Sequence, residues 1–180
     1  MKQLSTYITE GLKIGKKYRQ NKTYTYRPTS KTELKNIIHD LIDERGKDAD
    51  LNDIDVSKIT DMHGLFAFLQ IQNIDISKWD VSNVTDMSFM FDNCRDFNCD
   101  LSEWDVSQVT TTNNMFNQCW KFDSDLSEWD VSNVKDMYGM FYNCKNFNSD
   151  LSKWDISQVK EMRYMLGGCK KLKEIPEWYE

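Results

Sequence analysis

The sequence predicts an α/β fold: a short solenoid of stacked parallel strands and short helical turns, closed at its N-terminal end by a helix. Three observations predict it. A 25-residue unit recurs five times between about Asp50 and Lys173 without an insertion, apolar residues keep their positions in each copy, and an amphipathic segment precedes the first copy. One such unit cannot bury its apolar face alone, but stacked copies can.

The repeat is visible column by column. The motif Trp-Asp-Val/Ile-Ser begins at 79, 104, 129 and 154, and a degenerate first copy begins at Ile54. Other apolar columns keep the same register, with members Met90, Phe91, Cys94 and Phe97. Because the copies are equal in length, we expect turns of equal size along the solenoid.

Each unit contains two kinds of periodicity. Four apolar residues of one copy have the spacing of one helical face: Met87, Met90, Phe91 and Cys94. Thr85 suits a helix N-cap, and Asp86 suits the positive end of a helix. The next segment, 97–102, alternates apolar and polar residues, which predicts a strand. The aspartate and serine that follow each tryptophan indicate a turn.

An aspartate at one position of each copy predicts an acidic stripe. On neighbouring strands these outward-pointing carboxylates would lie about 4.8 Å apart: Asp50, Asp75, Asp100, Asp125 and Asp150. Charges at that spacing repel by about 1 kcal/mol in water and by more near a protein surface. We expect raised pKa values for the inner members Asp100 and Asp125. Hydrogen bonds from neighbouring serines or asparagines, or bound cations, could also relieve the repulsion, and of these two we favour a hydrogen-bonded structural ladder.

The cysteines form a second column. Their odd number argues against a closed disulfide framework, and four of them share the apolar face: Cys94, Cys119, Cys144 and Cys169. One thiol per turn, without a histidine column or a C-x-x-C pair, is not typical of a metal site. We interpret the column as core packing by free thiols, and we predict no metal site and no cofactor.

Positions where the copies disagree are candidates for binding. Trp120 occupies a column that elsewhere holds glutamine, arginine or lysine, so we expect it to be exposed. Exposed aromatic residues are enriched at contact sites. The predicted interaction residues are therefore Trp120, Tyr138, Tyr142 and Tyr164. Random variation of a solvated surface is the alternative.

The ends of the array differ from its middle. We divide the chain into a basic amphipathic helix and linker (1–27), a capping helix (28–49) and a five-repeat solenoid with a C-terminal cap (50–180). A capping box at 30–33 and an apolar stripe predict a helix over about 31–45, ending before Gly46. Pro176 removes a backbone donor and would block further strand pairing.

Charge and hydropathy limit the partners. Residues 1–27 hold seven basic side chains and one acidic, whereas the remainder holds 16 basic and 28 acidic. The net charge of −6 argues against nucleic acid as the main partner. No apolar run approaches the roughly 20 residues that span a bilayer, and the N-terminus lacks the features of a secretory signal. We expect a cytoplasmic protein, or one carried in a phage particle.

The pattern V-T-D-M-x-x-M-F-x-x-C-x-x-F-N-x-D-L-S-x-W-D-V-S, as it stands at 84–107, resembles the BspA-like leucine-rich-repeat family. The resemblance is to the 25-residue form common in mycoplasma lipoproteins and gut-bacterial surface proteins, and it covers roughly 50–175. It implies a curved, leucine-rich-repeat-like α/β solenoid used for adhesion or other protein contacts.

These observations favour a non-catalytic protein-binding scaffold. An enzyme would need a nucleophile with a base, a metal set or a phosphate loop, and the two histidines, His39 and His63, have no partner motif. A protein partner is therefore expected, and the sequence assigns no oligomeric state. The alternative is a structural or accessory component of a larger particle such as a phage virion, or a phage-encoded inhibitor that binds a host protein.

Overall fold

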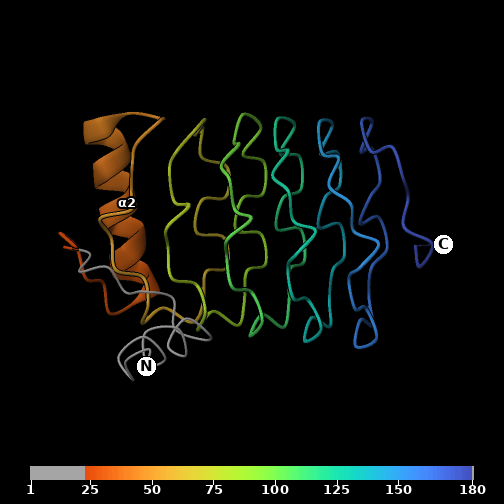
Figure 1. Ribbon diagram of the computed structural model, residues 1–180. Coiled ribbons are helices and arrows are strands. Elements are labelled where there is room, and N and C mark those ends of the chain that lie inside the picture. The colour runs from red at the N-terminus through yellow and green to blue at the C-terminus, as the bar shows by residue number, and fades with distance from the viewer. Residues whose placement is uncertain (1–22, 180) are drawn as a thin grey trace, which may run out of the picture.

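The computed structural model describes residues 23–179. In it the repeats stack coil against coil, and one helix lies at the N-terminal end of the stack (Figure 1). We number the coils in chain order: coil 1 (50–74), coil 2 (75–99), coil 3 (100–124), coil 4 (125–149) and coil 5 (150–173). The basic amphipathic helix predicted within 1–27 falls, up to residue 22, outside the described residues.

Helix α2 (Lys31–Arg45) forms where the capping box predicts it. The Ser30 hydroxyl accepts a hydrogen bond from the Glu33 N–H at 3.2 Å, and the Glu33 carboxylate accepts one from the Thr29 N–H at 2.8 Å. The helix ends at Gly46, whose φ of 89° favours glycine. The predicted helix and both of its ends are confirmed.

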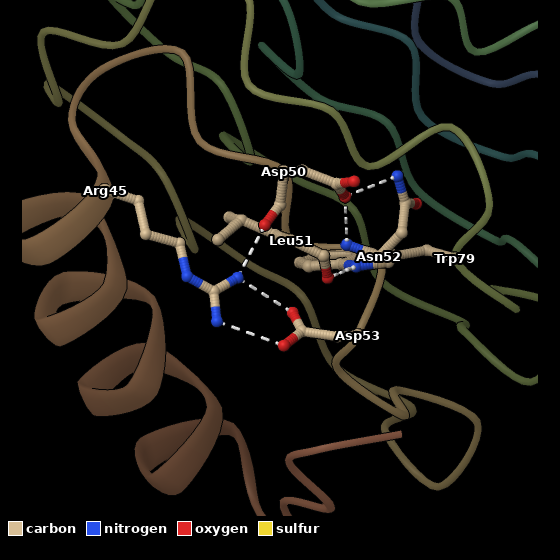
Figure 2. A network of polar contacts seen from close by, with 6 residues as sticks. All are labelled: Arg45, Asp50, Leu51, Asn52, Asp53 and Trp79. Atoms are coloured by element: carbon tan, nitrogen blue, oxygen red, sulfur yellow. Dashed lines mark hydrogen bonds and ion pairs between the residues drawn. The ribbon is translucent and has the colours of Figure 1, made fainter. Parts of the chain in front are cut away.

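Helix α2 covers the open end of coil 1. Its residues Leu34, Ile38 and Leu41 are buried in the same core as the repeats. At its last turn the Arg45 guanidinium donates to both carboxylate oxygens of Asp53, each at 3.0 Å, and to the Asp50 carbonyl at 2.7 Å (Figure 2). This pairing lowers the pKa of Asp53. The arginine therefore fixes the end of the helix to the first turn of the array.

The predicted α/β solenoid of stacked parallel strands and short helical turns is wrong. Within 23–179, α2 is the one helix, and the coils are joined by isolated parallel bridges rather than by strands of a sheet. Coil 1 and coil 2 meet at Asp50 and Asp75, and one further column bridges all coils: Asp61, Asp86, Thr111, Asp136 and Glu161. The repeats consist of consecutive turns.

Left-handed backbone explains why the segment after Asp86 is no helix. Two positions of each coil have positive φ, and they include Phe89 (57°) and Asn93 (58°) in coil 2. A helix cannot pass through such residues. The Phe91 N–H accordingly donates to the Met115 carbonyl of the next coil, at 2.8 Å. The Asp86 carboxylate accepts from the Ser88 N–H at 2.8 Å, so it closes a turn instead of facing a helix end.

Serine side chains explain why 97–102 is no strand. The predicted alternation is present, because Phe97, Cys99 and Leu101 are buried while Asn98 and Asp100 are exposed. The Leu101 N–H, however, donates to the hydroxyl of Ser124, at the end of the same coil, at 2.9 Å, where a sheet would offer a carbonyl. A hydroxyl inserted between the coils replaces one link of the ladder, and continuous pairing is lost.

Two stacks of phenylalanine rings form the centre of the core. Phe66, Phe91, Phe116 and Phe141 lie one above another, with ring centroids 5.3 to 5.6 Å apart. A second stack lies within 4.1 to 4.2 Å of the first: Phe97, Phe122 and Phe147. These columns bury the apolar face that no single coil could bury.

The cysteine and tryptophan columns bond as well as pack. Each thiol of the cysteine column lies within hydrogen-bond distance of a carbonyl of the preceding coil, as Cys144 does with Phe116 at 2.9 Å. The cysteines are free, as predicted, and burial raises the pKa of Cys94 and of Cys169 to about 12. Each tryptophan indole N–H donates to a carbonyl 28 residues earlier, as Trp129 does to Leu101 at 3.0 Å.

Candidate functional site

Three of the four predicted interaction residues meet on coils 4 and 5. The Tyr138 and Tyr164 rings are 5.6 Å apart, and the Tyr142 and Tyr164 rings are 6.2 Å apart, both edge to face. Tyr142 is 40% exposed and Tyr164 is 59% exposed. We call these three residues the tyrosine patch. Their contacts leave aromatic surface facing solvent on two consecutive coils. They lie in the segments that we call the outer turns, which are residues 61–68 of coil 1 and their equivalents 86–93, 111–118, 136–143 and 161–168.

Small residues make room for the patch. A Cβ added to Gly167 would lie 3.0 Å from Cδ2 of Tyr142, so the ring rests on the glycine of the next coil. Gly139, with φ of 58°, follows Tyr138, and a Cβ there would lie 2.6 Å from the Asn114 side-chain oxygen. Tyr164 itself has φ of 61°, which is uncommon outside glycine and asparagine. The backbone of the outer turns therefore determines where the three rings point.

A charged pair borders the patch. The Arg163 guanidinium lies 5.9 Å from the Tyr138 ring centroid, and its Nε donates to Glu161 at 2.9 Å. This pairing lowers the pKa of Glu161 to about 2. Arg163 and Glu161 come from coil 5, as does Tyr164, so aromatic and charged groups share one edge of the stack.

Trp120 lies apart from the tyrosine patch. Its ring has Arg95 at 4.6 Å and Lys145 at 3.5 Å, and these cations come from the coils on either side of coil 3. Trp120 is half-buried rather than exposed, and within 23–179 its ring contacts are with these cations, not with the tyrosines. The residue that departs from this otherwise polar column is therefore a tryptophan whose ring lies between two cations.

The acidic stripe is bonded within its own turns. Asp75, Asp100, Asp125 and Asp150 each accept from the N–H of the serine two residues later, at 2.9 to 3.0 Å. The expectation of raised pKa values for Asp100 and Asp125 is wrong. Their pKa values are lowered, because backbone and hydroxyl donors of Ser102 and Ser127 stabilise the charged form. The hydrogen-bond alternative explains how the stripe is tolerated.

A polar groove runs beside this stripe on coils 3 to 5, lined in part by Ser124, Asp125, Ser149 and Asp150. The Leu126 N–H donates to the Ser149 hydroxyl at 2.8 Å, and this hydroxyl bonds to Asp125 at 3.0 Å. These polar groups of the groove are thus hydrogen-bonded to one another. Across 23–179, no three His, Cys, Asp or Glu side chains gather as metal ligands would.

Two further residues of the outer turns were not predicted from the sequence. Phe68 is 69% exposed, in a column that elsewhere holds Asn93, Gln118, Asn143 and Gly168. Asp92 is buried and accepts from Asn117 at 2.8 Å, and burial raises its pKa. The signal that selected Trp120, a residue unlike the rest of its column, would also have found Phe68.

Comparison with known proteins identifies the family. The family model described as "Mycoplasma protein of unknown function, DUF285" matches residues 32–129 and 60–179. These matches cover most of the chain, so the chain belongs to this family. No curated protein and no solved structure matches it. In the part of the chain that the structure describes, no helix has the length and hydropathy to cross a membrane.

Proposed function

We propose that this member of the DUF285 family is a non-catalytic protein-binding scaffold, and that a protein partner docks on the tyrosine patch. The single observation that carries the proposal is the contact of Tyr138, Tyr142 and Tyr164 on the outer turns of coils 4 and 5. Most columns of the repeat are used for the core and the turns, whereas these rings contribute little to either.

The chemistry of the patch suits a protein interface. Tyrosine offers a large apolar ring with a polar hydroxyl, and it loses little conformational freedom on binding. The rings already contact one another, and the Tyr142 ring lies against Gly167. The tyrosine side chains therefore need little reordering when a partner binds. The Arg163 and Glu161 pair beside them adds polar groups at the rim.

The repeat pattern supports a closer kinship. We extend the proposal to the BspA-like type of repeat protein, because the pattern at 84–107 resembles it and the DUF285 match covers the same coils. This kinship implies contact with other proteins, and it implies neither a cofactor nor catalysis.

The test replaces two of the three tyrosines, each by a residue found in its own column. Asparagine occupies the Tyr142 column at Asn117 and the Tyr164 column at Asn114, where φ is also positive. The variant Tyr142→Asn/Tyr164→Asn is therefore compatible with the backbone. Full-length protein captures partners from a lysate of the cells that encode it, and the affinity for the purified partner is then measured for both forms.

We expect the double variant to bind the purified partner at least about thirtyfold more weakly, as for loss of a hot spot of about 2 kcal/mol. The matched control is Phe68→Asn, which replaces an exposed aromatic residue of coil 1 by the residue of its column in coil 2. This control should bind as the natural protein does. Equal binding by the double variant would refute the tyrosine patch as the docking surface.

A further inference from the structure

Within the outer turns, the backbone hydrogen bonds between consecutive coils all run in one direction. The residue just before each outer turn bonds the other way, as the Lys160 N–H does to the Lys135 carbonyl. From each coil to the next, four alternate N–H groups donate to carbonyls 24 residues later. In coil 4 the donors are the N–H groups of Met137, Gly139, Phe141 and Asn143. The outer turns therefore present backbone donors toward the C-terminal end of the stack, and each following coil supplies the acceptors.

Coil 5 leaves this row of donors largely open. Its members are the N–H groups of Met162, Tyr164, Leu166 and Gly168, which we call the donor edge. Within residues 23–179, the Leu166 N–H has a partner, the Tyr179 hydroxyl at 3.4 Å, and the other three N–H groups have no acceptor. An unpaired row of this kind is a template for another chain segment.

Apolar side chains beside the donor edge are also incompletely covered. Val159, Met162 and Leu172 pack against the core but are only partly buried. Their equivalents one coil earlier, Val134, Met137 and Phe147, are all 0% exposed. What covers them in coil 4 is coil 5. In the part of the chain that the structure describes, coil 5 thus lacks both the acceptors and the apolar contacts that a following coil supplies to coils 1 to 4.

A second copy of the chain does not fit this end. Two copies joined tail to tail about a twofold axis would place the donor edge of one copy against the donor edge of the other, and N–H groups cannot pair with N–H groups. A head-to-tail stack would have to displace α2, whose residues Leu34, Ile38 and Leu41 are buried over the other end. The occupant must therefore be a different segment, with alternate backbone carbonyls and apolar side chains.

We infer that a segment of the protein partner docks on the donor edge as one more outer turn, by accepting hydrogen bonds from the N–H groups of Met162, Tyr164 and Gly168. This inference rests on the proposed function and names its mode of contact. Tyr164 joins the two surfaces, because its ring belongs to the tyrosine patch and its N–H to the donor edge. Addition of a segment to an open edge gives affinity through the main chain, while side chains give specificity.

The probe is a peptide with the sequence of residues 133–146, which spans the outer turn that covers coil 3. There the carbonyls of Asp136, Tyr138, Met140 and Tyr142 accept from the row equivalent to the donor edge. The peptide is added to isotope-labelled full-length protein. We expect the amide signals of Met162, Tyr164 and Gly168 to shift, and their hydrogen exchange to slow about tenfold at a peptide concentration of about ten times Kd.

Two variants separate docking at the edge from other effects. Met162→Lys places a charge in the edge, so the peptide should no longer shift the remaining signals, while the spectrum of coils 1 to 4 stays unchanged. Ile175→Lys, at a side chain 66% exposed outside the row, should bind as the natural protein does. A peptide of scrambled sequence should leave every signal in place.

Unchanged exchange at all three amides with excess peptide would overturn the inference, as would self-association of the protein through this edge. Such a failure leaves the proposed function standing if Tyr142→Asn/Tyr164→Asn still loses the purified partner. Loss of the partner by Met162→Lys, together with peptide protection, supports the inference. Retention of the partner by Met162→Lys overturns it.

Discussion

Residues that repeat along this chain bond to the neighbouring coil as well as pack against it. The thiol of Cys144 shows this, because it lies 2.9 Å from the Phe116 carbonyl in a fully buried position. The same contact recurs at Cys94, Cys119 and Cys169. The cysteine column, which the sequence pattern predicts to be part of the core, therefore also donates hydrogen bonds to buried backbone carbonyls.

Removing one of these thiols should lower stability without changing the fold. Cys144→Val keeps an apolar side chain of similar size but has no donor for the Phe116 carbonyl. We expect the free energy of unfolding in urea to fall by about 1 kcal/mol, the usual net value of such a bond. Cys144→Ser, which retains a donor, is the control for the bond itself. Equal stability of Cys144→Val and the natural protein would contradict the role of the thiol.

The acidic stripe should make the fold sensitive to acid. The pKa of Asp125 is lowered in the folded protein from an ordinary value of 3.8, chiefly by its bond from the Ser127 N–H. Its stabilising contribution is thus present above pH 3.8 and is lost as pH falls through the lower, folded pKa. Asp125→Asn should show a smaller loss of unfolding free energy between pH 5 and pH 2 than the natural protein. An NMR titration giving Asp125 a pKa above 3.8 would contradict this.

At the scale of elements, α2 could be predicted because its signals are local. Ser30, Glu33 and Gly46 are its own caps, and each occupies the position that the sequence indicates. The coils could not be predicted in the same way. Their apolar spacing imitates a helix, while the residues that prevent one, Phe89 and Asn93, adopt left-handed backbone supported by hydrogen bonds that their N–H groups donate to the next coil.

The attachment of α2 to coil 1 should depend on Arg45. Arg45→Met keeps most of the apolar stem but loses both bonds to Asp53 and the bond to the Asp50 carbonyl. The paired side chains are about one third exposed, so we expect a loss of only about 1 to 2 kcal/mol. Hydrogen exchange of the α2 amides should quicken accordingly. Lys153→Met removes a pair with Glu128 that is mostly exposed, and it should leave stability almost unchanged.

For the whole molecule, the period alone predicts that coils stack and which columns lie inside. The contacts along the stack do not follow from the period, because they depend on which donor meets which acceptor 23 to 25 residues away. Leu101 meets a serine hydroxyl where Leu51 meets the Asp75 carbonyl, so similar columns pair differently. The tyrosine patch was predictable as three exceptions to the repeat, but their contact depends on Gly167 and on the turn at Tyr164.

A stack of this kind should open from its less covered end. Coil 1 is covered by α2, whereas coil 5 has three N–H groups that are unpaired within residues 23–179, and partly exposed apolar residues. In a repeat array each coil is stabilised mainly by its neighbours, so the terminal coil loses least when it opens. Native-state hydrogen exchange in increasing urea should give a lower opening free energy for the bonded amide of Leu166 than for its equivalents Phe116 and Phe141. If α2 or coil 1 opened first instead, the capping role of α2 would be contradicted. Since the donor edge lies on coil 5, a bound partner segment should raise the opening free energy of coil 5 more than that of the other coils.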